Sequence, residues 1–93
     1  VFSTDEIKIK TTDEAKFKLV AKLKECVKKE GCDLPKIKNI IDIDGIRIQF
    51  ENGWALVRAS NTTPVIVTRF EAKSKEFLAE IEQKVTNLLK SLM

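Results

Sequence analysis

Polar and apolar residues alternate along several stretches of the chain, as they do in strands that bury one face. This alternation is clear at residues 6–10 and 46–51, while residues 37–43, 54–59 and 65–70 are apolar-rich stretches next to turn residues that also predict strands. Asp44-Gly45 and Asn52-Gly53 separate the middle three stretches, and both dipeptides suit the positive φ values of two-residue hairpin turns. The pattern therefore predicts a meander of antiparallel strands flanked by two further strands.

Two other stretches carry apolar residues at steps of three and four, which is the period of an amphipathic helix. The first spans about residues 12–30, and the spacing of Thr11 and Glu14 indicates a capped start. The second begins after Ser74 and has the strongest periodicity in the chain. The order β-α-β-β-β-β-α predicts an α+β fold, a mostly antiparallel sheet with two amphipathic helices packed on it in a two-layer sandwich.

Length and composition limit what the chain can be. Its 93 residues are the size of one small domain, so we treat 1–93 as a single domain. The chain begins without Met and with no recognisable signal peptide, so we expect a piece of a longer cytoplasmic protein, with residues 1–5 as a linker remnant. The net charge of +3 is below that of a dedicated DNA-binding domain, and no apolar stretch predicts a membrane span.

The chain contains no histidine, which excludes a histidine general base, a Cys-His or Ser-His nucleophile pair and histidine metal ligands within it. Two cysteines, Cys26 and Cys32, do not have the spacing of zinc ligands and are too few for a structural zinc site. We expect no metal site and no catalytic residue in these 93 residues. We also expect both cysteines to be reduced, with Cys26 in the core and Cys32 in a loop.

One polar loop, between the strands predicted at 54–59 and 65–70, carries candidate binding chemistry. Its residues are Arg58, Ser60, Asn61, Thr62 and Thr63, followed by Pro64. A guanidinium can hold two phosphate oxygens at once, while hydroxyls and turn amides add neutral donors. The loop contains no base or nucleophile, so it suits holding a phosphate dianion rather than breaking a bond. Residues of these types also form ordinary turns, which composition alone leaves open.

The segments Asp-Gly-Ile at 44–46, Asn-Gly-Trp-Ala-Leu-Val-Arg-Ala-Ser-Asn-Thr-Thr-Pro at 52–64 and Arg-Phe-Glu-Ala at 69–72 resemble the C-terminal domain of the α-D-phosphohexomutases. The resemblance is closest to the phosphomannomutase/phosphoglucomutase branch. That family carries an Arg-x-Ser-(Gly/Asn)-Thr-x-Pro loop, then a strand, then Glu-Ala before the last helix. The resemblance extends from residue 6 to the last helix.

The resemblance implies a four-domain parent enzyme that interconverts hexose 1-phosphate and hexose 6-phosphate through a phosphoserine and a hexose 1,6-bisphosphate. It implies that other domains of the same chain bind Mg²⁺ and the bisphosphate, and that this domain alone is inactive. Its partners are then a phosphorylated hexose and those other domains, with no nucleic acid and no membrane. A hinge at residues 1–5 would let the domain close over the site.

The implied task of the C-terminal domain is to clamp the phosphate that is not being transferred. By motif position, the substrate-phosphate ligands are Arg58, Ser60, Asn61, Thr62 and Thr63. Many relatives place a further arginine three residues after the proline, where this chain has Val67. Arg69 lies two residues further along the same strand, on the same face, and is therefore an additional candidate.

Three alternatives remain open at this point. A small nucleic-acid-binding module could use the Lys-rich first helix between Lys16 and Lys29, although glutamates interrupt its lysines. A small stand-alone phosphatase, of the size of the acylphosphatases, could hydrolyse an acyl phosphate with an arginine and an amide side chain. A purely structural or interaction domain would use none of these side chains for chemistry.

Overall fold

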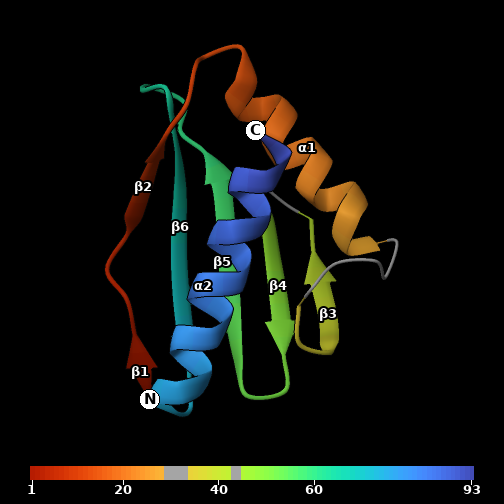
Figure 1. Cartoon of the computed structure of the whole chain (residues 1–93), viewed down its shortest axis with the longest axis vertical. Coiled ribbons are helices and arrows are strands. Elements are labelled where there is room, and N and C mark those ends of the chain that lie inside the picture. The colour runs from red at the N-terminus through yellow and green to blue at the C-terminus, as the bar shows by residue number, and fades with distance from the viewer. Residues whose placement is uncertain (29–33, 43–44) are drawn as a thin grey trace.

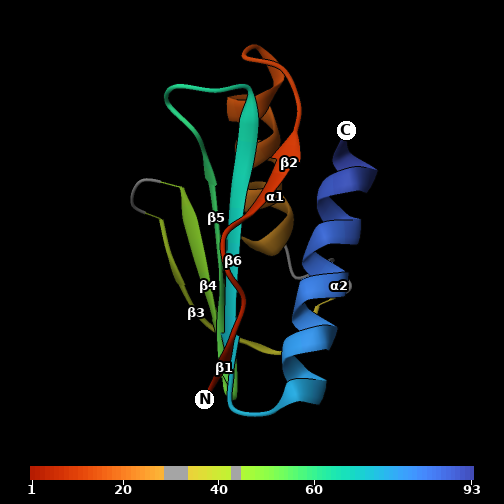
Figure 2. The ribbon, with the colours of Figure 1, turned by 90° about the vertical axis from the view of Figure 1, so that its left-hand side faces the viewer.

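The computed structural model describes residues 1–28, 34–42 and 45–93, which form two layers (Figures 1 and 2). A six-stranded antiparallel sheet is one layer of this described part, and two helices cover one face of the sheet. The strands are β1 (Phe2–Ser3), β2 (Ile7–Lys10), β3 (Ile37–Ile41), β4 (Ile46–Phe50), β5 (Gly53–Ala59) and β6 (Val65–Ala72); the helices are α1 (Ala15–Lys28) and α2 (Lys75–Leu92). The predicted α+β fold is confirmed.

The sheet is built around β6. The meander β3-β4-β5-β6 has the predicted order, and both β1 and β2 pair with the free side of β6. Phe2 pairs with Ala72, and Thr4 continues the contact because its backbone N–H donates to the Phe70 carbonyl at 3.0 Å. The pattern did not predict β1, which lies within residues 1–5. Their role as a linker stays a prediction, and a hinge inside them would have to break these contacts.

Side-chain hydroxyls begin both helices. Ser74 caps α2 as predicted, because its Oγ accepts a hydrogen bond from the Phe77 N–H at 3.1 Å. At α1 the hydroxyl of Thr12, rather than that of Thr11, accepts from the Ala15 N–H at 3.0 Å. Helix α1 therefore begins at Ala15, three residues later than the pattern indicates. Each such contact satisfies a backbone donor that has no partner within its helix.

The core lies between the sheet and the two helices. It is formed by Leu19, Val20, Leu23 and Val27 of α1, Ile81, Val85 and Leu89 of α2, and alternate residues of β4, β5 and β6, among them Ile48, Val57 and Phe70. At the edge of this core the rings of Phe50 and Phe77 meet edge to face, with centroids 5.9 Å apart. Burying each large apolar side chain contributes about 1.5–3 kcal/mol, so this one layer of contacts holds the helices to the sheet.

The expectation for Cys26 is wrong. Cys26 is half-buried on α1 rather than in the core, and it is disulfide-bonded. The prediction of reduced cysteines rested on the expected cellular compartment and on the small number of cysteines. Two cysteines are too few for a scaffold held by several disulfides, but they are enough for a single one. The expectation for Cys32 lies outside the described residues.

An ion-pair cluster ties the second half of α1 to the end of β3. Lys24 Nζ lies 2.6 Å from Asp42 Oδ1, and Lys28 Nζ lies 3.1 Å from Asp42 Oδ2. The hydrogen bond from Lys24, followed by that from Lys28, lowers the pKa of Asp42 below its ordinary value of 3.8. The carboxylate therefore favours the folded state wherever it is ionised.

We predict that Asp42→Asn lowers the free energy of unfolding near neutral pH and that this loss disappears in acid. A lowered pKa means that the contribution of Asp42 is complete above 3.8 and is lost as the pH falls through the folded-state value. Thermal melts of both proteins across this range measure the difference in Tm. A difference that stays constant on acidification would contradict the prediction. The effect is small, because the pair is at the surface.

Glycine is required at the start of β4. Gly45 has a φ of 101°, and a Cβ at this position would lie 2.6 Å from the Val57 carbonyl oxygen and 2.6 Å from Arg58 Cβ. Such a contact cannot form without displacing the backbone of β5. Because Gly45 has no Cβ, the chain that leads into β4 can lie against Val57 and Arg58 of β5. Arg58 is the first residue of the candidate loop motif.

We predict that Gly45→Ala destabilises the fold by about 1–3 kcal/mol and moves the backbone at Arg58. Chemical denaturation measures the first effect, and amide chemical shifts of residues 58–63 measure the second. Gly53→Ala is the matched control, because its Cβ would meet the Glu71 carbonyl and Ala72 at the other end of β5. Gly53→Ala should also lower the stability, but it should leave the amide chemical shifts of residues 58–63 unchanged. Equal shifts in both variants would show that Gly45 has no special relation to Arg58.

Candidate phosphate-binding site

The candidate loop connects β5 and β6 at one end of the sheet, at the same end as the connection between β2 and α1 (Figures 1 and 2). Its base is closed by a hydrogen bond from the Ser60 N–H to the Val65 carbonyl at 3.1 Å. Within the loop, the Val65 N–H donates to the Thr63 carbonyl at 2.8 Å, which turns the chain into β6. The loop is therefore a closed, hydrogen-bonded turn between two long paired strands.

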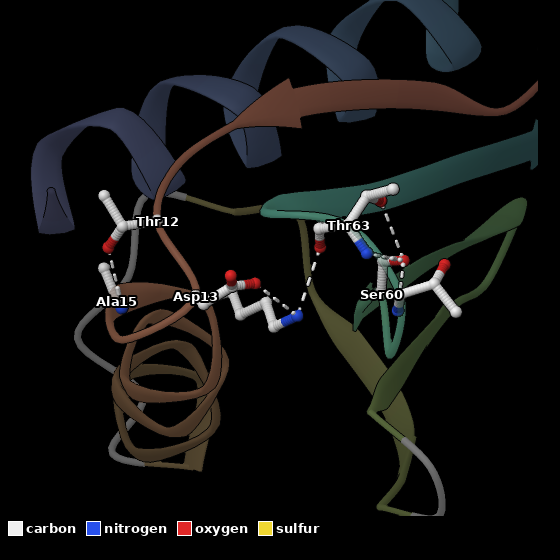
Figure 3. Close-up of polar contacts among 7 residues, drawn as sticks. Thr12, Asp13, Ala15, Ser60 and Thr63 are labelled. Atoms are coloured by element: carbon white, nitrogen blue, oxygen red, sulfur yellow. Dashed lines mark hydrogen bonds and ion pairs between the residues drawn. The ribbon is translucent and has the colours of Figure 1, made fainter.

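The hydroxyl of Ser60 is the centre of this turn (Figure 3). Ser60 Oγ accepts from the backbone N–H groups of Thr62 and Thr63, each at 3.3 Å, and forms a hydroxyl–hydroxyl contact with Thr63 Oγ1 at 3.0 Å. A hydroxyl has two acceptor lone pairs and one proton. The two amides use both lone pairs of Ser60 Oγ, so this oxygen organises the backbone of the turn.

The two loop amides are directed at Ser60 Oγ. Both hydrogen bonds are long for N–H···O contacts, so they are weak. An anion oxygen that approached Thr62 and Thr63 from outside would be a stronger acceptor than the serine hydroxyl. An anion could use these amides only by opening their bonds to Ser60 Oγ, which are weak enough to be replaced.

The two arginines predicted from the sequence lie on the sheet face that the helices leave uncovered. Arg58 pairs with Val67, and Leu56 pairs with Arg69, so Arg58 and Arg69 are diagonal neighbours on adjacent strands. Both side chains are exposed. The shared face expected for Val67 and Arg69 is confirmed by this register. Among the loop residues Ser60 is half-buried, while Asn61, Thr62 and Thr63 are exposed.

Sequence reasoning missed Arg47, which lies on the same open face. Arg47 pairs with Leu56 from the side opposite Arg69, so three arginines surround Leu56. Its guanidinium lies 4.3 Å from the ring centroid of Trp54, whose indole N–H donates to Glu71 Oε2 at 3.1 Å. The alternation of β4 placed Arg47 on this face, but nothing in the sequence indicates that it stacks on Trp54.

Lys16 was also missed as a neighbour of the loop. It is only 4% exposed, and its Nζ donates to the Thr63 carbonyl at 3.1 Å. The available signal was its position, because Lys16 lies four and seven residues before Val20 and Leu23, on the apolar stripe of α1. A charged residue on that stripe is unusual, and the structure shows what it contacts.

Three lysines of the Lys-rich helix are already engaged with protein groups. Lys16 is buried, and Lys24 and Lys28 are paired with Asp42. Among the described residues there is no group of three or more acidic or cysteine side chains that could hold a metal ion. The same residues contain no helix long and apolar enough to cross a membrane.

Comparison with known proteins identifies the family. Residues 6–88 match the profile described as "Phosphoglucomutase/phosphomannomutase, C-terminal domain". The chain is 43% identical over 91 residues to the phosphomannomutase/phosphoglucomutase of Pseudomonas aeruginosa, a match that covers 97% of this chain and 18% of the relative. It is 48% identical over 80 residues to the corresponding protein of Pseudomonas putida, covering 86% of this chain and 16% of the relative.

A solved structure of the same family has the same fold. The crystal structure of a phosphoglucomutase/phosphomannomutase family protein from Burkholderia thailandensis superposes with a TM-score of 0.78 at 34% identity, over 98% of this chain and 18% of that chain. The chain thus spans less than a fifth of the length of the relatives that it matches. It belongs to the phosphoglucomutase/phosphomannomutase family, and it corresponds to the C-terminal domain of these proteins.

Proposed function

We propose that this domain binds the non-transferring phosphate of a phosphorylated hexose in a phosphomannomutase/phosphoglucomutase. The parent protein would interconvert hexose 1-phosphate and hexose 6-phosphate through a phosphoserine and a hexose 1,6-bisphosphate. The observation that carries the proposal is the turn centred on Ser60, which holds neutral donors beside Arg58. The family match supports it and does not favour the nucleic-acid alternative.

The charge of the loop suits a phosphate dianion. The segment 58–64 contains one arginine and no acidic residue. Arg58 can give a two-pronged contact, while the hydroxyls of Ser60, Thr62 and Thr63 and the side-chain amide of Asn61 can donate singly. Neutral donors in a fixed turn recognise phosphate oxygens without the entropy loss of ordering a flexible chain. Arg69, diagonal to Arg58, is proposed as a second positive group for the same phosphate.

The chemistry of transfer is assigned to the rest of the parent protein. The loop has no nucleophile or base, and the chain has no histidine. The proposal therefore places the phosphoserine, the Mg²⁺ ion and the bisphosphate in other domains of the same polypeptide. The contribution of this domain is binding and orientation, which lower the barrier only when the other domains supply the reacting groups.

We predict that phosphorylated hexoses shift the amide resonances of Arg58–Thr63 with a Kd on the order of 1 mM, since a single phosphate site provides little free energy. Mannose 1-phosphate and glucose 6-phosphate are the ligands, and free mannose is the unphosphorylated control. Arg58→Ala should weaken binding about tenfold or more, because it removes a charge-assisted hydrogen bond. Ser60→Ala should weaken it through loss of the turn.

Lys73→Ala is the matched control for charge, since it removes a positive side chain at the other end of the sheet. It should leave the Kd unchanged. Arg69→Ala distinguishes a direct ligand from a neighbour: binding weakened as far as in Arg58→Ala would make Arg69 a ligand. Binding by free mannose, or equal losses in Arg58→Ala and Lys73→Ala, would refute a specific phosphate site.

We predict that the isolated domain has no mutase activity. Incubation with glucose 1-phosphate, Mg²⁺ and glucose 1,6-bisphosphate should produce no glucose 6-phosphate in a ³¹P NMR time course. A full-length relative serves as the positive control. Conversion by the domain alone would refute the proposal that the reacting groups lie in the other domains. Release of inorganic phosphate from acetyl phosphate would favour the phosphatase alternative.

A further inference from the structure

Lys16 occupies a place where an apolar residue would be expected. It lies in the first turn of α1 on the stripe that continues through Val20, Leu23 and Val27, and it is only 4% exposed. Burying an ammonium group costs free energy unless the group is paired and hydrogen-bonded. A leucine or methionine would continue the stripe without that cost. The contacts of Lys16 therefore need an explanation beyond core packing.

Those contacts are directed at the candidate loop. Lys16 Nζ donates to the Thr63 carbonyl at 3.1 Å and lies 3.0 Å from Asp13 Oδ1 (Figure 3). Asp13 itself is exposed, so the ammonium of Lys16 lies between a carboxylate at the surface and the carbonyl of Thr63 in the loop. The ammonium group thus joins the start of α1 to the one loop residue that contacts Ser60 twice.

A second contact from the same segment holds the neighbouring peptide. The Thr11 N–H donates to the Pro64 carbonyl at 2.9 Å. Two successive carbonyls, of Thr63 and Pro64, are therefore held by residues 11–16. The amide and hydroxyl of Thr63 both point to Ser60 Oγ, so rotation of Thr63 would break these contacts together.

The buried ammonium also places a positive charge beside the loop, 3.1 Å from the Thr63 carbonyl oxygen. Charges at buried sites are screened less by salt than charges in solvent, so this one would attract an anion bound at the loop. Asp13 offsets part of the charge, but it lies on the far side of the ammonium and in solvent, where screening is strong.

We propose that Lys16 is a positioning residue of the phosphate site, which holds Thr63, and through it Ser60, in the geometry that binds an anion. The proposal rests on the proposed function only for the identity of the ligand. Its structural part, that Lys16 sets the conformation of the loop, stands without any ligand.

The test compares Lys16→Met with wild type and with Lys18→Met, an exposed lysine on the same helix. Methionine continues the apolar stripe, so we expect Tm to be kept or raised. In the ligand-free protein, the amide resonances of Thr62 and Thr63 should nevertheless move. Binding of mannose 1-phosphate should weaken about tenfold, the usual effect of losing a hydrogen bond to a charged group. Lys18→Met should change neither the loop resonances nor the Kd for mannose 1-phosphate. Lys16→Arg should keep part of the affinity that Lys16→Met loses.

Unchanged loop resonances and an unchanged Kd in Lys16→Met would overturn the proposal. If Lys16→Met fails to fold, Asp13→Asn decides instead, because it removes the carboxylate that orients the ammonium without touching the core. Asp13→Asn should shift the same loop resonances and lower Tm, because it leaves the buried ammonium without its carboxylate. Constant loop resonances in this variant would overturn the proposal. If the wild-type domain binds no mannose 1-phosphate, the proposed function fails, while the ligand-free spectra still decide the role of Lys16.

Discussion

The pairing of β5 with β6 is the constraint on which the rest of the molecule depends. Its register runs from Gly53 opposite Ala72 to Ala59 opposite Ile66. Because side chains alternate along both strands, this one register sends Ala55, Val57 and Phe70 to the helices and Leu56, Arg58 and Arg69 to the open face. A slip by one residue would exchange the two sets and bury the arginines.

The pairing of β5 with β6 also positions the loop that connects them. Its last pair lies directly before Ser60, and the hydrogen bond from Ser60 to Val65 continues the ladder by one step. The candidate residues therefore lie at the end of two paired strands rather than on a free loop. Residues 11–16 then support the loop from behind, so that both its ends and its back are fixed. Rigid support of this kind is what a site made of weak neutral donors needs.

The periodic parts of the fold could be predicted from the sequence. Alternation and β-branched runs indicated five of the six strands of the described part, and Ser74 marked the start of α2. Asn52-Gly53 marked the place of the β4–β5 connection, but the positive φ expected of Gly53 is wrong, because Gly53 is already the first residue of β5 and pairs with Ala72. Strand β1 was missed because two residues cannot show a period, and its existence depends on an edge of β6 that only the folded sheet provides. The choice of Thr12 over Thr11 as the cap is likewise a matter of local geometry.

The site was predictable only in part. A motif indicated Arg58, Ser60, Asn61, Thr62 and Thr63 as candidates, and strand alternation placed Arg69 on the face that it shares with Val67. The contacts that organise these residues join parts of the chain far apart in sequence. Lys16 and Thr63 are separated by 47 positions, and the charge of Lys16 suggested solvent rather than the core. The disulfide of Cys26 shows the same limit, since residue counts constrain pairing without deciding it.

The open face also contains an optical probe. Trp54 is the only tryptophan of the chain, and it is held between the guanidinium of Arg47 and the carboxylate of Glu71, one on each neighbouring strand. Its emission therefore senses the alignment of three adjacent strands at once. The indole lies towards the β4–β5 turn, whereas the candidate loop is at the other end of β5. Intrinsic fluorescence thus follows the unfolding of the sheet with the native residue alone, without an introduced label and at a distance from the ligand.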